Sequence, residues 1–279
     1  MIDVHMHIGK LYFEEALTPS YLLNFMDENE IEKAALLPIE NPEETYYYVT
    51  TEEVLKACKK YPDRFIPFCN VDPRRGNADT STDFYRIIKE YKEKGCKGFG
   101  EAMSGLYIDD VRLQKIYEVC GKLEMPIIFH IDGLRNIDEK GLPRFEKMIK
   151  KFPETIFIGH AQHFWAEISS DIKKEDFSSY PKGKIKEGGV VENLLFNYSN
   201  LYADLSAGSG FNAITRDPEF GYQFLEKFQD KLFFGTDLCH INQKVPIISY
   251  LKKSLKEGRI SKAVYDKITC ENAQKILKW

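Results

Sequence analysis

The stretch Asp3-Val-His-Met-His7 decides how the rest of the sequence is interpreted. It lies in an apolar run from Ile2 to Ile8, close to the first residue. If this run is a β-strand, alternate side chains share one face, so Asp3, His5 and His7 point the same way. The two histidines are then roughly 6.6 Å apart at the backbone. Their rings can lean together and bind one metal ion at about 2.0–2.1 Å per bond. A single His-x-His can equally be a buried, hydrogen-bonded pair without metal, so the rest of the chain must decide.

Seven further short apolar runs follow, and helical patterns fill nearly every gap between them. The expected strands span residues 2–8, 33–39, 65–71, 96–103, 125–130, 155–160, 201–205 and 231–237. The expected helices span residues 21–27, 51–60, 80–94, 109–123, 142–151, 222–228, 246–255, 261–269 and 271–277. Continuous apolar runs indicate strands covered on both faces, and their alternation with helices indicates a parallel sheet.

Eight such units fit a (β/α)8 TIM barrel with extra C-terminal helices, which predicts one domain over residues 1–279. An open doubly wound sheet is the alternative. No Gly-rich phosphate loop follows any expected strand, so the pattern does not indicate a nucleotide-binding fold.

The composition indicates a soluble globular protein. Hydrophobic residues make up 43% of the chain and charged residues 29%, which is typical of a soluble domain. The net charge of −4 and the lack of a basic cluster argue against a nucleic-acid partner. No apolar run is long enough to cross a membrane, and no leader peptide precedes the first strand, so we expect a cytoplasmic protein. The six cysteines show no regular spacing and are expected to be reduced. The sequence is compatible with a homo-oligomer.

Two long connections, residues 164–189 and 206–218, each follow an expected strand and precede a helix. In a barrel both rise over the carboxyl ends of the strands, where long loops serve as lids or substrate walls, or are simple surface insertions. Other side chains near this mouth are candidates for lining a pocket or are ordinary surface residues: Lys10, Tyr107, Arg135, Trp165 and Arg216.

Five of the eight expected strands end in a residue that can bind metal or transfer a proton. These residues are His5 and His7, Glu101, His130, His160 and Asp237. In a (β/α)8 barrel the carboxyl ends of the strands converge on one mouth, so side chains more than two hundred positions apart meet there. Each residue alone has a plainer explanation: a buried core histidine, a salt-bridge partner, or a helix N-cap. The shared placement of four of the six histidines and two acids predicts a metal centre.

At this point the chain resembles the amidohydrolase superfamily, specifically its amidohydrolase-2 branch of metal-dependent TIM-barrel hydrolases and decarboxylases. The matching pieces occur in order along nearly the whole chain: Asp3-Val-His-Met-His7, Tyr61-Pro-Asp-Arg-Phe65, Asn70-Val-Asp-Pro73, Gly95-Cys-Lys-Gly98, Pro126-Ile-Ile-Phe-His130, Phe152-Pro153, Gly159-His160, Asn200-Leu-Tyr-Ala-Asp204, Phe234-Gly-Thr-Asp237 and Glu271-Asn-Ala-Gln-Lys-Ile-Leu277.

The resemblance implies a role for each candidate. His5 and His7 would be the metal ligands of the first strand, and His130 would be the third imidazole ligand. Asp237 would bind the metal and accept the proton of its water. His160 would orient or activate that water, or complete a second metal site.

Glu101 is the position at which the family varies, and a carboxylate there could bridge two metals. Three neutral imidazoles and one carboxylate leave a divalent ion charged, with an open position for water or substrate. Such an ion lowers the pKa of bound water from about 15.7 towards ~7. Nitrogen and oxygen ligands favour Zn²⁺, as one or two ions, and do not exclude Mn²⁺ or Fe²⁺.

We therefore expect a metal-dependent hydrolase in which the activated water attacks an amide, ester or lactone bond of a small molecule. The main alternative is a metal-dependent non-oxidative decarboxylase of an unsaturated or aromatic acid, which the resemblance also allows. Two further hypotheses are a metal-binding barrel without turnover and a TatD-like deoxyribonuclease. The acidic net charge counts against the nuclease.

Overall fold

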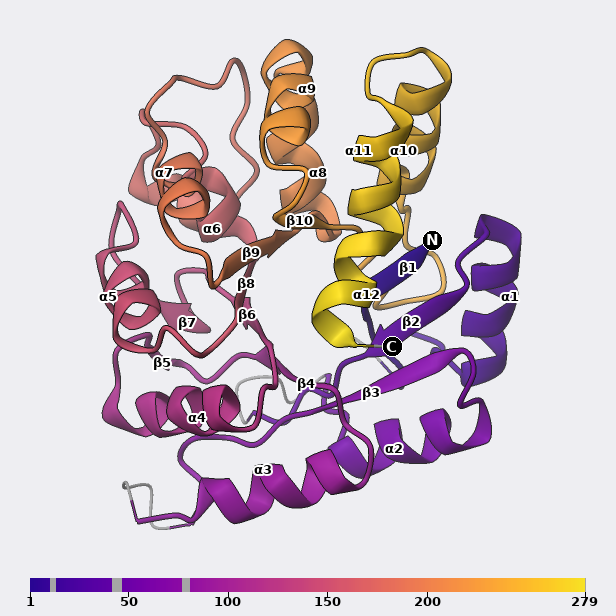
Figure 1. Ribbon diagram of the computed structural model, residues 1–279, viewed down its shortest axis with the longest axis vertical. Coiled ribbons are helices and arrows are strands. Elements are labelled where there is room, and N and C mark those ends of the chain that lie inside the picture. The colour runs from indigo at the N-terminus through magenta and orange to yellow at the C-terminus, as the bar shows by residue number, and fades with distance from the viewer. Residues whose placement is uncertain (11–13, 42–46, 77–80, 279) are drawn as a thin grey trace.

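The chain forms an eight-stranded parallel sheet rolled into a barrel and surrounded by helices (Figure 1). The computed structural model describes residues 1–10, 14–41, 47–76 and 81–278. In sheet order the strands are β1 (Ile2–Met6), β2 (Lys33–Leu36), β3 (Phe65–Cys69), β4 (Gly98–Ala102), β6 (Ile127–His130), β8 (Phe157–His160), β9 (Leu201–Asp204) and β10 (Leu232–Phe233). Each neighbouring pair in this order is parallel, as the sequence predicts.

Hydrogen bonds between the first and last strands close the barrel. Val4 donates its backbone N–H to the Phe234 carbonyl at 3.1 Å, and Asp237 donates to the His5 carbonyl at 2.8 Å. These bonds confirm the barrel and exclude the open sheet, because an open sheet leaves its two edge strands unpaired.

Helices alternate with the strands in chain order. They are α1 (Pro19–Asn29), α2 (Thr51–Lys60), α3 (Phe84–Glu93), α4 (Val111–Lys122), α5 (Pro143–Lys151), α6 (Gln162–Ala166), α7 (Val190–Asn197), α8 (Ala207–Thr215), α9 (Pro218–Lys227), α10 (Pro246–Lys256), α11 (Lys262–Asp266) and α12 (Asn272–Leu277). A π-helical turn over Lys267–Glu271 joins α11 to α12. Of the helix expected over residues 80–94, Thr80 lies outside the described residues, and α3 begins after its N-cap Asp83.

Two large apolar clusters fill most of the described part of the molecule, and a third, small one joins Ala166, Ile172 and Phe177. The larger joins the outer sides of the strands to the helices, as for Phe129 of β6 and Phe145 of α5, whose rings stack at 5.8 Å. The smaller of the two large clusters gathers side chains from β1, β2, β3, β6, β8 and β10, which can meet only inside the barrel. Its members include Val4, Phe68 and Ile128. The barrel interior is therefore packed, which leaves its mouth for polar groups.

The connection over residues 206–218 differs from the expected loop, because most of it is helix α8. Its small residues serve close packing instead of irregular backbone. A Cβ added at Gly210 would lie 2.5 Å from the Leu205 carbonyl carbon, so only glycine lets the helix lie directly on the end of β9. The other long connection, residues 164–189, contains the end of α6 and a short 3-10 helix over Lys174–Ser178. Within the described residues no helix is both long and apolar enough to span a bilayer.

Candidate metal centre

The structure brings the six predicted site residues together at one end of the barrel. Among the described residues, three overlapping groups place their ligand atoms within 4.8 Å of one another: His5, His7, Glu101 and Asp237; His5, His160 and Asp204; and Glu101, His130 and His160. Four of the six predicted side chains are buried, while those of His130 and Asp237 are 13% and 18% exposed. Solvent therefore reaches the centre past His130 and Asp237.

The first group has the dimensions of a tetrahedral metal site. The Nε2 atoms of His5 and His7 are 3.1 Å apart. Oε2 of Glu101 lies 3.5 and 3.4 Å from these two nitrogens, and Oδ1 of Asp237 lies 3.6 and 3.2 Å from them. A tetrahedral ion with bonds of about 2.1 Å has ligands about 3.4 Å apart. Five of the six distances among these four atoms are therefore close to those expected around one ion.

The outward-facing nitrogens of His7 and His130 are held by acceptors. Nδ1 of His7 lies 2.9 Å from the Leu37 carbonyl oxygen, which can only accept a hydrogen bond. Nε2 of His130 lies 3.2 Å from Oδ2 of Asp132. The acceptor fixes the proton on the outward nitrogen, so the opposite nitrogen presents its lone pair to the centre.

Asp204 holds the outward-facing nitrogens of two histidines at once. Its Oδ2 lies 2.8 Å from Nδ1 of His5, and its Oδ1 lies 3.1 Å from Nδ1 of His160. Burial raises the pKa of this carboxyl group, but the neighbouring imidazoles outweigh burial and hold the pKa well below its usual range. The backbone carbonyl of Asp204 accepts a bond from the Trp165 indole at 2.9 Å, which assigns that predicted lining residue to the core. Asp204 is a site residue that the sequence did not predict, although it lies one residue before the end of the strand expected over residues 201–205.

The carboxylates of Glu101 and Asp237 make the centre negatively charged, and the inward imidazole lone pairs point into it. The negative charge raises the pKa values of the histidines. For His5, burial lowers the pKa, but the charges of Asp237, Asp204 and Glu101 raise it well above 6.5. For His130, burial again opposes, and Glu101 contributes most to raising the pKa to about 9. A divalent cation supplies the missing positive charge without protonating the ligands, so the donor set fits such an ion.

Glu101 faces two pairs of histidines. Its Oε2 lies toward His5 and His7, as described above, whereas its Oε1 lies 2.5 Å from Nδ1 of His130 and 3.5 Å from Nε2 of His160. Either oxygen of Glu101 could therefore be a metal ligand, but an ion held between its Oε1 and Nδ1 of His130 would require these two atoms to move apart.

Asp3 lies on the predicted face of β1, but its carboxylate accepts hydrogen bonds from backbone N–H groups. Its Oδ1 accepts bonds from the N–H groups of His5 at 2.9 Å and Thr236 at 3.1 Å, which ties the start of β1 to the segment before Asp237. Burial raises the pKa of Asp3 to about 7. Asp3 therefore positions the ligands and does not face the centre.

Arg135 lies beside the centre, unlike some of the other predicted lining residues. Its Nη1 lies 2.6 Å from Oδ2 of Asp132, the carboxylate that also holds His130. In contrast, the ring of Tyr107 is 52% exposed and stacks with the Arg144 guanidinium at 4.6 Å.

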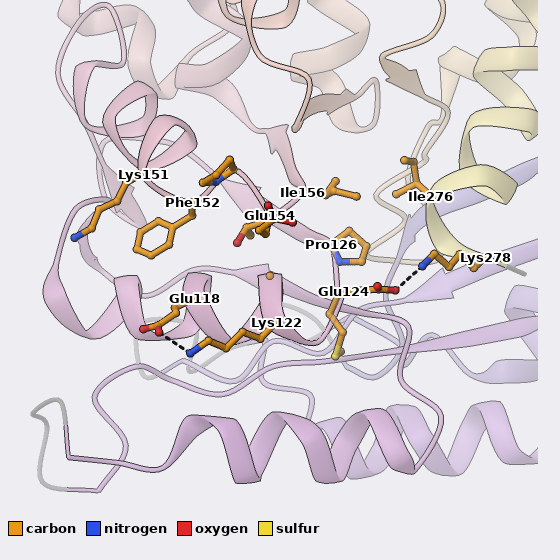
Figure 2. A pocket seen from close by; sticks show the side chains of 14 residues that line it. Glu118, Lys122, Glu124, Pro126, Lys151, Phe152, Glu154, Ile156, Ile276 and Lys278 are labelled. Atoms are coloured by element: carbon orange, nitrogen blue, oxygen red, sulfur yellow. Dashed lines mark hydrogen bonds and ion pairs between the residues drawn. The ribbon is translucent and has the colours of Figure 1, made fainter.

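The groove in Figure 2 lies away from these residues. It has a volume of about 570 Å³ and is lined by residues that precede β6 and β8, such as Pro126 and Ile156, at the amino ends of the strands. Its charged rim is paired internally, with Lys122 on Glu118 at 2.7 Å and Lys278 on Glu124 at 2.6 Å. Active sites of such barrels lie at the opposite end, so we assign no chemistry to the groove.

Comparison with known proteins agrees with this geometry. Three of the solved structures that share the fold illustrate the likeness. One is an uncharacterised TIM-barrel protein from Bordetella bronchiseptica (TM-score 0.65, 17% identity, covering 92% of this chain and 81% of that chain). The second is a probable 2-pyrone-4,6-dicarboxylic acid hydrolase from Acinetobacter baumannii with citric acid bound (TM-score 0.63, 16% identity, covering 100% of this chain and 99% of that chain). The third is a dihydroxybenzoic acid decarboxylase from Polaromonas sp. JS666 with manganese and 2-nitroresorcinol bound (TM-score 0.62, 17% identity, covering 99% of this chain and 96% of that chain).

At these identities the structural likeness shows the fold alone, and no match was found among the curated proteins searched. The family model described as amidohydrolase, of the amidohydrolase-2 type, matches residues 2–279. This chain therefore belongs to the amidohydrolase-2 family.

Proposed function

We propose that this chain is a metal-dependent hydrolase that cleaves an amide, ester or lactone bond in a small carboxylic acid. The observation that carries the proposal is the set of inward imidazole nitrogens and carboxylate oxygens whose outward partners leave them free to bind a cation. When bound, a divalent ion polarises a substrate carbonyl and lowers the pKa of a water.

The residues divide into two groups around Glu101. His5, His7 and Asp237 would hold one ion with Oε2 of Glu101, and His130 and His160 would hold a second with its Oε1. The nitrogen and oxygen ligands suit Zn²⁺ and Mn²⁺ equally in type, and one of the similar structures contains manganese.

Asp237 and His160 are the proposed catalytic residues. Oδ1 of Asp237 faces His7. Its Oδ2, on the same partly exposed side chain, is therefore the atom that would accept a proton. His160 has its Nδ1 held by Asp204, so its Nε2 faces the centre. That nitrogen would orient the attacking water if one ion is bound, or would hold the second ion if two are bound.

The acidic substrate class rests on two observations. Arg135 places a guanidinium group next to Asp132 and His130 at the exposed side of the centre. Two of the similar structures hold citric acid and 2-nitroresorcinol, and the names of these two proteins refer to carboxylic acids. A second candidate function, non-oxidative decarboxylation, follows from the same names, because the Polaromonas neighbour is a decarboxylase.

One assay separates the two reactions. The metal-loaded protein is incubated with a panel of lactones, amides and aromatic carboxylates in ¹⁸O-labelled water. Hydrolysis places ¹⁸O in the product, whereas decarboxylation releases CO₂ without it. The apo-protein with and without added Zn²⁺ or Mn²⁺ is the control for metal dependence, and a plasmid-cleavage assay tests the nuclease hypothesis.

A further inference from the structure

Within the described part of the chain, a buried hydroxyl beside the metal centre has no hydrogen-bond partner. Tyr47 is 4% exposed, and its hydroxyl makes no hydrogen bond with the residues that the structure describes. Its ring lies edge-on to the ring of His7, with centroids 5.2 Å apart. Buried polar groups are nearly always hydrogen-bonded, and phenylalanine would fill the same space without that loss. The unpaired hydroxyl therefore indicates that a hydrogen-bond acceptor, such as an oxygen of a bound ligand, is missing at this position.

The backbone holds this side chain in place. Two residues after Tyr47, Val49 pairs with Ile39 through reciprocal bonds of 2.9 and 3.0 Å. The same Val49 packs on Gly9, where an added Cβ would lie 2.8 Å from its Cγ2. Because Gly9 also has a φ of +95°, a side chain there would be strained and would push the segment away from the end of β1. The position of the ring is thus built into the fold.

The groups around the hydroxyl define what it can bind. The Cys239 thiol is the neighbouring polar group, but sulfur is a weak acceptor, and the thiol donates its own hydrogen to Oδ1 of Asp237 at 3.2 Å. The charges of Asp237 and Glu101 also act on the phenol, and, together with burial, they keep it protonated. Tyr47 therefore offers a hydrogen-bond donor beside the centre.

We propose that the Tyr47 hydroxyl donates a hydrogen bond to a negatively charged oxygen of the substrate at the metal centre. This inference rests on the proposed function. The acceptor would be a carboxylate oxygen, or the carbonyl oxygen that gains charge during attack, because both are oxygen acceptors that a divalent ion also attracts. Tyr47 would then be a catalytic residue that touches the substrate, whereas the cluster around Asp204 touches only the ligands.

The test uses Tyr47→Phe in the full chain, loaded with Zn²⁺. Acetohydroxamate, whose oxygens bind metal ions, serves as the probe, and its affinity is measured by calorimetry. We expect the affinity to fall about 10- to 100-fold, the loss typical of a bond to a charged group. Metal content by elemental analysis and the melting temperature of the metal-free protein should not fall. Tyr48→Phe is the matched control, since Tyr48 is adjacent and 51% exposed, and its affinity should equal that of the wild type.

Two outcomes overturn the role of Tyr47 alone: equal acetohydroxamate affinity in Tyr47→Phe and wild type, or a lower melting temperature of the metal-free variant, which would reveal a structural partner for the hydroxyl. A wild-type protein that retains no metal, or that binds metal but no acetohydroxamate, overturns the proposed function and the role of Tyr47 with it.

Discussion

Replacing Asp204 by asparagine should weaken metal binding while leaving the barrel folded. Each oxygen of this carboxylate takes one imidazole N–H, from His5 at 2.8 Å and from His160 at 3.1 Å. An asparagine amide has the same shape but only one acceptor oxygen, and its NH₂ group can only donate. One of the two histidines would then have to present a lone pair outward and its proton toward the metal, which prevents it from acting as a ligand.

The size of the effect follows from the loss of an outer partner of two histidines. Removing such a partner typically costs 10- to 100-fold in metal affinity, or about 1.4–2.7 kcal/mol. Competition with a chelator of known affinity, for Zn²⁺ and Mn²⁺ separately, measures this directly. Asp63→Asn makes the same chemical change at an exposed position and should leave both affinities unchanged.

An Asp204→Asn protein with wild-type metal affinity and an unchanged circular dichroism spectrum would refute the reasoning. It would mean that the protons of His5 and His160 are not fixed by this carboxylate, and the argument for inward lone pairs would fail at two of the four histidines.

Three further predictions follow from the same geometry. His5→Ala should lose both bound metal and activity while the circular dichroism spectrum stays that of the folded barrel; near-normal turnover would remove His5 from the site. In the metal-free protein the folded pKa of His130 is raised from 6.5 to about 9, so its stabilising effect is complete below pH 6.5 and is lost as the pH rises toward 9. The melting temperature of the metal-free protein should therefore fall across this window, and a rise would contradict the assignment. Gly159→Ala should destabilise the fold by about 1–3 kcal/mol in urea, because the added Cβ would lie 2.3 Å from the buried Phe164 ring. Gly133→Ala, with no atom within 4 Å, is its control, and equal stabilities would show that the ring moves freely.

The sequence predicts the residues that face the centre better than the residues that hold those side chains from outside. His130 and His160 were found because each ends a buried strand, and the ends of parallel strands meet whatever the details of their register. Asp204 and Asp132 act through the outward nitrogens of these histidines, and that contact depends on which way each ring turns. Nothing in strand periodicity specifies a ring rotation, so these partners emerge only from the folded structure.

Short elements and small residues caused the remaining differences in the fold. A two-stranded sheet pairs β5 (Leu106–Tyr107) with β7 (Asn136–Ile137), and strands of two residues have no period to detect. Residues 206–218 were expected only as a connection, and the glycines of α8 disfavour a helix in isolation. In the structure their value is the absence of a side chain where α8 meets β9, a tertiary requirement that outweighs local propensity.

Closure of the barrel and assembly of the metal centre are the same structural event. The bond from the Asp237 N–H to the His5 carbonyl joins the last strand to the first, and it connects residues whose side chains face the same ion position. Asp3 adds a second link through Thr236. A cation held by ligands from both ends of the chain binds only the closed barrel, so it stabilises the fold by mass action, by about 4.1 kcal/mol at a concentration 1,000 times its Kd. Because the carboxylates repel each other in its absence, the ion offsets a cost that the closed barrel otherwise bears. We therefore expect folding and metal binding to form one linked equilibrium in this protein, so that a ligand substitution changes the stability of the metal-loaded barrel through the affinity it removes.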